Sequence, residues 1–301
     1  MLTRDDFKAV ELSDKVVFDK HYKRFPQLHS DYLFSTMMCW KHYMKYYYVL
    51  IDNSIIIMTE QGNNVKLRPP IGKPSADLDM LAIKFALEEC TDPPYSMIDS
   101  NAKKRLLDQF PKLDFTPHRE FFEYIYLATD LRDLKGKNYL KIRNQLNHFK
   151  KHNEYSIQPI TSENMQEVNK FLNRWCLWRD CDKDIILKNE KDAVLYSIDH
   201  FFELDLSGII IIIYGNIEAA AIFETQNENT AVIHFEKAIP DFKGLYQAIN
   251  QETAKILAET HKFINRESDM GIPGLRVAKE KYHPHHMVEV YHLNREQLSS
   301  I

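Results

Sequence analysis

The chain has 301 residues, which is long for one compact domain and sufficient for two of ordinary size. Its composition, 44% hydrophobic and 27% charged residues, is that of a globular protein, and its 8 glycines argue against a glycine-rich nucleotide-binding architecture. A formal net charge of -4 excludes a general attraction for nucleic acid or anionic lipid, so any such partner needs a local basic patch.

The sequence lacks signals for membrane insertion or export. Its longest apolar run, Ile209 to Tyr214, is far shorter than the roughly 20 residues that a membrane-spanning helix needs. The N-terminal residues have no apolar signal core, and these features together predict a cytoplasmic protein. The cysteines are scattered without a Cys-x-x-Cys pair, so we expect reduced and mostly buried thiols.

Apolar spacing and turn residues predict the elements of the first half. The β-rich runs are separated by turn signals at 52–53 and 60–63, which is typical of an antiparallel meander. In chain order we predict a helix at 13–25, strands at 45–51, 54–59 and 64–68, a helix at 76–89, a strand at 95–98, a helix at 101–110 and a strand at 122–127.

The second half repeats this order of elements. We predict helices at 162–178 and 190–205, strands at 208–214, 217–225 and 230–236, a helix at 244–259, a strand at 262–265, a helix at 275–282 and a strand at 287–293. The repeat lies in the order of elements and not in residue identity. It predicts two copies of one fold, whose central sheets should superpose.

Helix, meander, helix, strand, helix, strand is an order that resembles the GNAT acyltransferase fold. The predicted fold class is α/β (α+β), with tandem GNAT-like domains that each contain a mixed, mostly antiparallel sheet flanked by helices. The predicted divisions are an N-terminal domain at 1–130, a basic connecting helix at 131–152 and a C-terminal domain at 153–301, which carries the candidate active site.

The connecting segment is strongly basic. Residues 132–152 contain seven Lys or Arg against a single Asp. At helical spacing, one face is apolar and consists of Tyr139, Ile142, Leu146 and Phe149. The opposite face consists of Lys137, Lys141, Asn144, His148 and Lys151. Two interpretations stay open: a solvated linker helix, or a surface that binds the phosphates of a nucleic acid or a nucleotide cofactor.

Three segments carry a resemblance to a known family. The first, 134–149, contains Gly-Lys, then Lys-x-Arg-Asn, then Asn and an aromatic residue. The second contains Glu236-Lys-Ala and then Gly244-x-Tyr-Gln-Ala-Ile-Asn250. The third is Ile264-Asn-Arg-Glu-Ser-Asp-Met-Gly-Ile-Pro-Gly-Leu-Arg276 with Ala278-Lys-Glu-Lys-Tyr-His-Pro284. Together they resemble the C-terminal domain of the phosphatidylglycerol lysyltransferase family.

This resemblance implies tandem GNAT-like domains, an aminoacyl-tRNA donor and no permanently bound cofactor. In the family the acceptor is a phospholipid, but this chain lacks the family's membrane-embedded half, so a lipid acceptor is not implied. A small molecule, a peptide and a lipid headgroup all stay open as acceptors. The implied substrate-binding residues are Lys137, Lys141, Arg143, Asn144, Asn147, Lys237, Asn250, Asn265, Glu267, Arg276 and His283.

Aminoacyl transfer needs a group that takes a proton from the attacking amine and donors that stabilise the developing oxyanion. Glu236 and Asp269 are candidates for the first role. Arg266, Lys279 and Tyr282 are candidates for the second, or for protonating the leaving hydroxyl. We expect Glu236, Arg266 and Asp269 in one cleft facing the basic helix, some with perturbed pKa values.

Each of these residues also has a structural interpretation. Glu236 can pair with Lys237, Arg266 or Lys279 at the strand end. Arg266 and Asp269 can form a salt bridge that holds the loop, and Tyr282 can lie in the core. The run His283-Pro-His-His286 has a poor ligand spacing, so we expect no metal site there.

Two other functions stay open. An acyl-coenzyme A dependent N-acyltransferase of the same fold needs a basic, glycine-rich loop at a helix N-terminus, where this chain has a single glycine, Gly244, after Lys243. The third function is a tRNA- or nucleotide-binding module without turnover. Such a module gains nothing from Glu267 and Asp269, so the acid-rich run 265–269 favours an enzyme.

Overall fold

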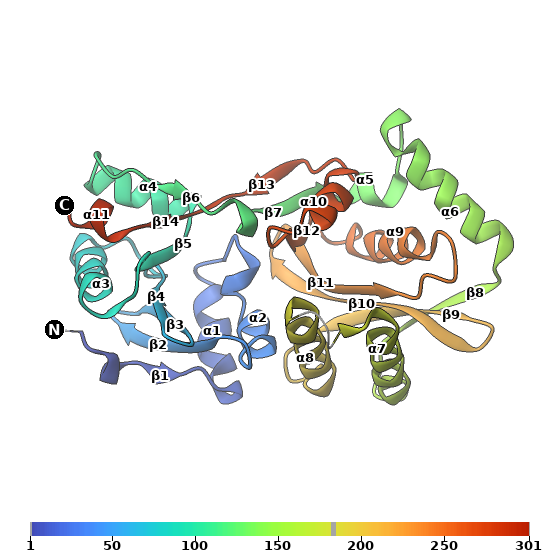
Figure 1. The fold of residues 1–301 in the computed structure, drawn as a ribbon, viewed down its shortest axis with the longest axis horizontal. Coiled ribbons are helices and arrows are strands. Elements are labelled where there is room, and N and C mark those ends of the chain that lie inside the picture. The colour runs from blue at the N-terminus through green and yellow to red at the C-terminus, as the bar shows by residue number, and fades with distance from the viewer. Residues whose placement is uncertain (1, 182–184, 301) are drawn as a thin grey trace. The chain divides into compact units, whose positions relative to one another are not determined.

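The computed structural model describes residues 2–181 and 185–300. The chain divides into two compact units. Unit 1 comprises Met1–Phe122 together with Val288–Ile301, and unit 2 comprises Glu123–Met287. In the described residues each unit holds a mixed, mostly antiparallel sheet flanked by helices (Figure 1), which confirms the predicted α/β class.

The sheet of unit 1 starts from the predicted meander, β2 (Lys45–Ile51), β3 (Ser54–Gln61) and β4 (Asn64–Leu67). Asp52 and Asn53 turn the chain between β2 and β3 with φ values of 47° and 60°, a left-handed conformation that Asp and Asn tolerate. The strand order is β1-β2-β3-β4-β5-β14-β6. The other strands are β1 (Lys8–Ala9), β5 (Tyr95–Asp99), β6 (Thr116–Pro117) and β14 (Val290–Leu293).

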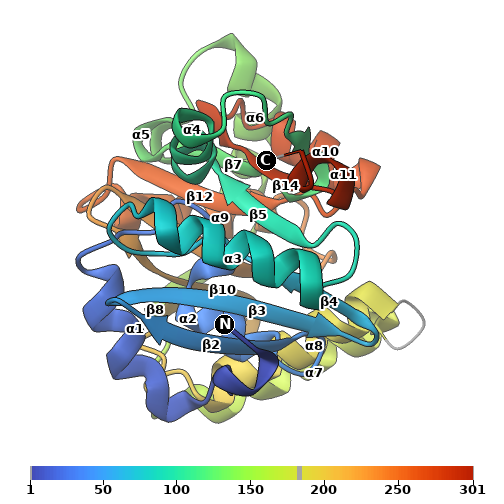
Figure 2. The same ribbon diagram turned by 90° about the vertical axis from the view of Figure 1, so that its left-hand side faces the viewer.

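Helices cover both faces of this sheet. The helix α3 (Ala76–Glu89) lies across one face (Figure 2), where Ile83 packs with Ile56 and Leu67. On the other face the ring of Phe18 contacts the rings of Phe34 and Tyr48, with centroids 5.3 and 5.0 Å apart. The remaining helices are α1 (Lys15–Tyr22), α2 (Phe34–Cys39), α4 (Ser100–Gln109) and α11 (Arg295–Leu298), with short 3-10 turns at Arg4–Asp6, Leu12–Asp14, Ser30–Tyr32 and Arg119–Phe121.

The sheet of unit 2 has the strand order β13-β7-β12-β11-β10-β9-β8. The strand β12 lies parallel to β11 and antiparallel to β7, whereas the pairs β8–β9, β9–β10 and β10–β11 are antiparallel. The bounds are β7 (Glu123–Leu127), β8 (Tyr155–Pro159), β9 (Ser207–Ile213), β10 (Asn216–Asn227), β11 (Thr230–Ala238), β12 (Phe263–Ser268) and β13 (His286–Val288).

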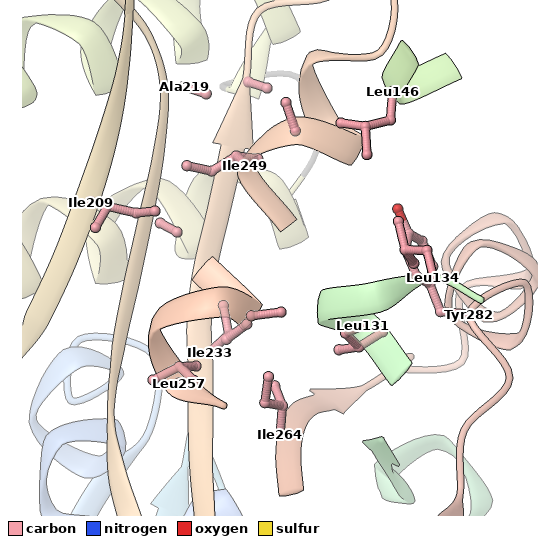
Figure 3. Packing of buried hydrophobic residues seen from close by; sticks show 14 of the residues in the cluster. Leu131, Leu134, Leu146, Ile209, Ala219, Ile233, Ile249, Leu257, Ile264 and Tyr282 are labelled. Carbon is pink, nitrogen blue, oxygen red and sulfur yellow. The ribbon is translucent and has the colours of Figure 1, made fainter. Parts of the chain in front are cut away.

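The core of unit 2 lies between its sheet and the helices α5 (Ala128–Asp133), α6 (Leu140–His152) and α9 (Leu245–Leu257). Figure 3 shows Leu146, Ile233 and Ile249 among the side chains that pack there. The helices α7 (Met165–Arg179) and α8 (Ile185–Asp199) lie across β10 and β11 from α9 (Figure 1). The unit also contains a 3-10 turn at Lys137–Tyr139 and α10 (Pro273–Glu280).

The observed units differ from the predicted divisions 1–130, 131–152 and 153–301. The strand β7 falls in the first predicted domain but pairs with β12 of unit 2, and β14 falls in the last but pairs with β5 and β6 of unit 1. The basic helix also belongs to unit 2, because Ile142, Leu146 and Phe149 are buried in the core of that unit. Local apolar patterns identify a strand, whereas the strand that it pairs with is determined by tertiary packing.

Candidate active site

Three polar side chains from neighbouring elements of unit 2 meet beside α9. Glu236 lies near the end of β11, Arg266 near the end of β12, and Asn250 on the crossover helix α9 between these strands. Asn250 Nδ2 donates to Glu236 Oε2 at 3.2 Å, and Arg266 Nη2 lies 3.4 Å from Glu236 Oε1. Parallel strands joined by a helix lie side by side, which brings their ends together. We call these three residues the Glu236 cluster.

A β-bulge in β11 decides which face Glu236 occupies. Glu236 pairs with Ala221 and Ile233 with Phe223, so β11 has one residue more than β10 over this stretch. Glu236 therefore shares the face of Ile233, which packs in the core with α9. Strict alternation along 231–236 predicts Glu236 on the face of His234, and this prediction from the sequence is wrong because alternation fails across the bulge.

The Glu236 cluster contains polar atoms without partners. Among the described residues, the buried atoms Asn250 Oδ1, Arg266 Nη1 and Thr253 Oγ1 have no hydrogen-bond partner. Thr253 lies one turn after Asn250 on the buried side of α9. Buried polar atoms are nearly always hydrogen-bonded, and an unpaired one costs about 1–3 kcal/mol. The unpaired donor of Arg266 and the unpaired acceptor of Asn250 belong to residues that both contact Glu236, and a polar substrate can complete them.

The guanidinium of Arg266 is held between aromatic rings. It lies 4.8 Å from the ring centroid of Tyr282 and 5.8 Å from that of Tyr126. Burial opposes its charge, but Glu236 and the two tyrosines outweigh burial and raise the pKa of Arg266. Arg266 is therefore a fixed positive charge with one free N–H edge, which suits the stabilisation of a developing oxyanion.

Tyr282 is part of the core of unit 2, as the structural interpretation had it. Burial raises the pKa of its hydroxyl to about 12, although Arg266 lowers it. Its carbonyl accepts from the Tyr139 hydroxyl at 3.0 Å, which ties the end of α10 to the start of the basic helix. A hydroxyl that keeps its proton at neutral pH can donate a hydrogen bond but cannot act as a base.

Lys279 holds the backbone of β12. Its Nζ donates to the carbonyl of Arg266 and, at 3.2 Å, to that of Glu267. Glu267 has a left-handed φ of 57° there, so the ammonium fixes an irregular stretch of strand. Burial lowers the pKa of Lys279 to about 8, with a further contribution from the positive charge of Arg266. Since Nζ faces carbonyl oxygens, its role is to position Arg266.

The lowered pKa of Lys279 predicts a stability that rises with pH. Between about 8 and the ordinary 10.5 the unfolded chain binds more protons than the folded one, so the free energy of unfolding increases over this window. Lys279→Met has no group that titrates here. From about pH 7.5 to about pH 10 the unfolding free energy of the wild type should therefore rise relative to that of Lys279→Met. Urea denaturation at both pH values measures it, and a pH-independent difference contradicts the burial of a charged Lys279.

Asp269 lies in a separate group of contacts. Its carboxylate is fully buried and accepts from Arg276 Nε at 2.8 Å and Nη2 at 3.0 Å, from the Tyr124 hydroxyl at 2.7 Å and from the amide of Gly271 at 2.9 Å. These bonds fix the loop between β12 and α10. Asp269 and Arg276 thus contact each other, whereas Glu236 contacts Asn250 and Arg266.

His234 was missed by the sequence analysis. Its ring is buried between two carboxylates, with Nε2 2.7 Å from Glu224 Oε1 and Nδ1 2.8 Å from Glu267 Oε1. Burial disfavours the imidazolium, but both carboxylates outweigh burial and raise the pKa of His234 to about 10. The sequence did contain a signal for His234, because it is the one titratable residue in the otherwise apolar run 231–235.

Asn265 continues the polar network near Glu267. Its Nδ2 donates to Glu123 Oε2 at 2.7 Å and Gln226 Oε1 at 2.9 Å, and its Oδ1 accepts from the amide of Glu267. Asn265 and Glu267 therefore have structural contacts that fix the end of β12. Neither contacts the Glu236 cluster through a described hydrogen bond.

Lys237 and His283 lie elsewhere in unit 2. Lys237 is buried, pairs with Glu190 at 2.6 Å and lies 4.4 Å from the ring centroid of Trp175, on the face covered by α7 and α8. His283 is exposed, and its ring meets that of Tyr139 edge-on at 5.3 Å. The alternation along β11 places Lys237 opposite to Glu236.

The basic helix α6 presents the predicted polar face to solvent. Lys137, Lys141, Asn144 and Asn147 are exposed, as are His148 and Lys151. Arg143 differs, because its Nη1 donates to the carbonyls of Leu134 and, at 2.7 Å, Gly136, and so closes the loop before the helix. The exposed set contains side chains that suit phosphate contacts.

Among residues 2–181 and 185–300 no group of His, Cys, Asp and Glu side chains could hold a metal ion, and no helix is long and apolar enough to cross a membrane. One small pocket lies beside Trp175 and Lys237, and another, of about 280 Å³, lies in unit 1. Neither is lined by Glu236 or Arg266.

The sheets and crossover helices define the class of fold. A tandem GNAT protein from the clavulanic acid biosynthesis pathway has a similar structure, with a TM-score of 0.50, 6% sequence identity and coverage of 96% of this chain and 98% of that chain. The protein therefore has the tandem GNAT-like fold that the sequence predicted.

The chain belongs to the family described as phosphatidylglycerol lysyltransferase, C-terminal, whose profile matches residues 22–294. A conserved protein of unknown function from Bacteroides thetaiotaomicron VPI-5482 is 30% identical, with a TM-score of 0.86 and coverage of 96% of this chain and 98% of that chain. The C-terminal domain (DUF2156) of a putative lysylphosphatidylglycerol synthetase from Agrobacterium fabrum is 13% identical, with a TM-score of 0.66 and coverage of 96% and 95%. No curated protein matches the chain.

Proposed function

We propose that the protein is an aminoacyltransferase that moves an aminoacyl group from aminoacyl-tRNA to an amine or hydroxyl acceptor. The observation that carries the proposal is the Glu236 cluster, where a carboxylate contacts a charged guanidinium and an amide. The guanidinium and the amide each keep an unpaired polar atom, and the chain belongs to a transferase family. We also propose a cytoplasmic location, where charged tRNA is present.

The chemistry follows from the positions of these groups. The acceptor nitrogen or oxygen attacks the ester carbonyl of the donor, a new C–N or C–O bond forms, and the bond to the ribose oxygen of the tRNA breaks. Glu236 takes the proton from the attacking group, and the free N–H edge of Arg266 binds the oxyanion. The proton then passes to the leaving ribose hydroxyl. Asn250 orients Glu236, and Lys279, Asp269 and Arg276 position the strand end and loop.

The structure gives coenzyme A less support as a donor. Gly244 precedes α9 with a φ of 93°, and a Cβ at this position would lie 2.2 Å from the carbonyl oxygen of Gln145 on α6. The glycine is therefore explained by the close packing of α6 against the start of α9. It does not require a bound pyrophosphate, which in GNAT acetyltransferases occupies a helix N-terminus of this kind.

A transfer assay with two donors tests the proposed function. The full chain is incubated with radiolabelled charged tRNA or with acyl-coenzyme A, each with a panel of amines, hydroxyl compounds, peptides and phospholipid headgroups. We expect label from the charged tRNA in an acceptor, at a rate that Arg266→Ala lowers about a hundredfold or more. Transfer from acyl-coenzyme A alone favours the N-acyltransferase, and tRNA binding without transfer from either donor favours a binding module.

Charge reversal on α6 is expected to weaken tRNA binding. In the triple variant Lys137→Glu, Lys141→Glu, Lys151→Glu the affinity should fall, and the slope of log affinity against log salt should shrink by about one for each lost phosphate contact. The control reverses Lys20, Lys23 and Lys73, which are exposed lysines of unit 1. Filter binding at several salt concentrations measures both variants. Equal affinities of the two variants, or no binding at low salt, contradict this docking surface.

A further inference from the structure

The pocket of about 280 Å³ in unit 1 lies where two parallel strands part. The strands β4 and β5 pair at Leu67 and Tyr95, and the chain that follows each strand lines the pocket. The first wall is 69–72, the second is 99–102 at the start of α4, and the third is 24–27 after α1. Ligands of open α/β sheets commonly bind at the carboxyl ends of parallel strands.

Hydrogen bonds hold the walls in place. His21 Nε2 lies 2.7 Å from the carbonyl oxygen of Ile71, and Arg105 Nη2 donates to the carbonyl of Pro70 at 3.3 Å. The Tyr32 hydroxyl donates to the carbonyl of Met97 at 2.7 Å. A pocket with fixed walls loses little conformational entropy when a ligand binds, so even a small ligand can be held.

The charged groups of the pocket leave two complementary binding positions. Arg105 binds the buried Asp79 through Nε and Nη2, both at 3.0 Å, and its Nη1 has no partner among the described residues. Arg24 lines the pocket without an ion pair in the described structure. Asp99 uses one oxygen to cap α4 at the amide of Ala102, at 2.8 Å, and its other oxygen has no described hydrogen bond.

We propose that this pocket binds a free α-amino acid with an apolar side chain. Asp79 neutralises Arg105, so the positive charge of Arg24 and the negative charge of Asp99 are left, which suits a zwitterion. The carboxylate of the ligand binds Arg24 and Nη1 of Arg105, and its ammonium binds Asp99.

The other walls and the size of the pocket agree with this ligand. Phe25, Pro26, Pro69 and Pro70 present apolar surface to a side chain. A volume of about 280 Å³ lies just below the roughly 300–1,000 Å³ of drug-sized ligand pockets, so it suits a small ligand and is small for a nucleotide cofactor. The site belongs to unit 1 and does not depend on the transfer reaction proposed for the Glu236 cluster.

Calorimetric titration of the full chain with each proteinogenic amino acid tests the proposal. We expect saturable binding that is tightest for apolar side chains. The matching amino-acid amide lacks the carboxylate and the N-acetyl derivative lacks the ammonium, so each should bind about tenfold more weakly or worse. Absence of binding at millimolar concentrations, or equal binding of both derivatives, overturns the proposal.

Two variants locate the binding site. Arg24→Ala removes an exposed side chain, and Asp99→Asn removes the charge while it keeps the N-cap of α4, so both should fold. Each should weaken binding about tenfold. Lys23→Ala, an exposed neighbour that does not line the pocket, should bind as the wild type does. If Arg24→Ala and Asp99→Asn both keep wild-type affinity, the amino acid binds elsewhere and the proposal fails.

Discussion

Replacing Glu236 by Gln is expected to lower the rate of aminoacyl transfer about a hundredfold or more, because a general base contributes roughly 10²–10⁴ to such a reaction. The glutamine oxygen can still accept from Asn250 Nδ2, which now bonds the carboxylate at 3.2 Å. The cluster should therefore keep its geometry and lose only its proton acceptor. The measurement is single-turnover transfer from charged tRNA, alongside urea denaturation to confirm that the variant is folded.

Arg266→Ala should have an effect of similar size, because one oxyanion donor contributes about 10²–10³. Arg266→Lys keeps the charge but loses the planar edge between the rings of Tyr126 and Tyr282, so it should recover only part of the activity. The matched control is Glu259→Gln, a carboxylate at the surface of unit 2 that should leave the rate unchanged. A Glu236→Gln variant with full activity assigns proton transfer to another group.

Helical faces were the feature best predicted from the sequence. The spacing of Tyr139, Ile142, Leu146 and Phe149 predicted the buried face of α6, and all four are in the core of unit 2. The expectation that Glu236, Arg266 and Asp269 share one cleft rested on the rule that parallel strands joined by a helix lie side by side. Arg266 and Asn250 do contact Glu236, whereas Asp269 bonds to Arg276, Tyr124 and Gly271. Both inferences depend on the spacing of apolar residues and on the order of elements along the chain, which can be read directly from a sequence.

Features that depend on pairing could not be predicted in the same way. The bulge in β11 moves Glu236 to the other face from His234, and nothing in the run 231–236 marks the extra residue. The left-handed φ of Glu267 is stabilised by Lys279, which is distant in sequence. The predicted last strand at 287–293 is divided into two strands that join different sheets. The strand β13 lies beside β7 in the sheet of unit 2, and β14 lies between β5 and β6 in the sheet of unit 1.

Asp269→Ala is expected to lower the free energy of unfolding of unit 2 by about 3 kcal/mol, since removal of one member of a buried ion pair typically costs 3–5 kcal/mol. The carboxylate accepts from Tyr124, from the amide of Gly271 and twice from Arg276, and all of these donors lose their acceptor together. Asp269→Asn keeps the shape and part of the hydrogen bonding, so its cost should be smaller. The control is Asp241→Ala at an exposed position, which should change the free energy by less than about 0.5 kcal/mol.

Tryptophan fluorescence can follow unit 2 alone. The sequence has 3 tryptophans, and in a Trp40→Phe background only Trp175 and Trp178, both in unit 2, report on unfolding. Urea titration then gives the unfolding free energy of that unit for each variant. If Asp269→Ala keeps the wild-type value within about 0.5 kcal/mol and still abolishes transfer, Asp269 takes part in the chemistry, as its position in the acid-rich run suggested, and its bonds to Arg276 serve to orient a catalytic carboxylate.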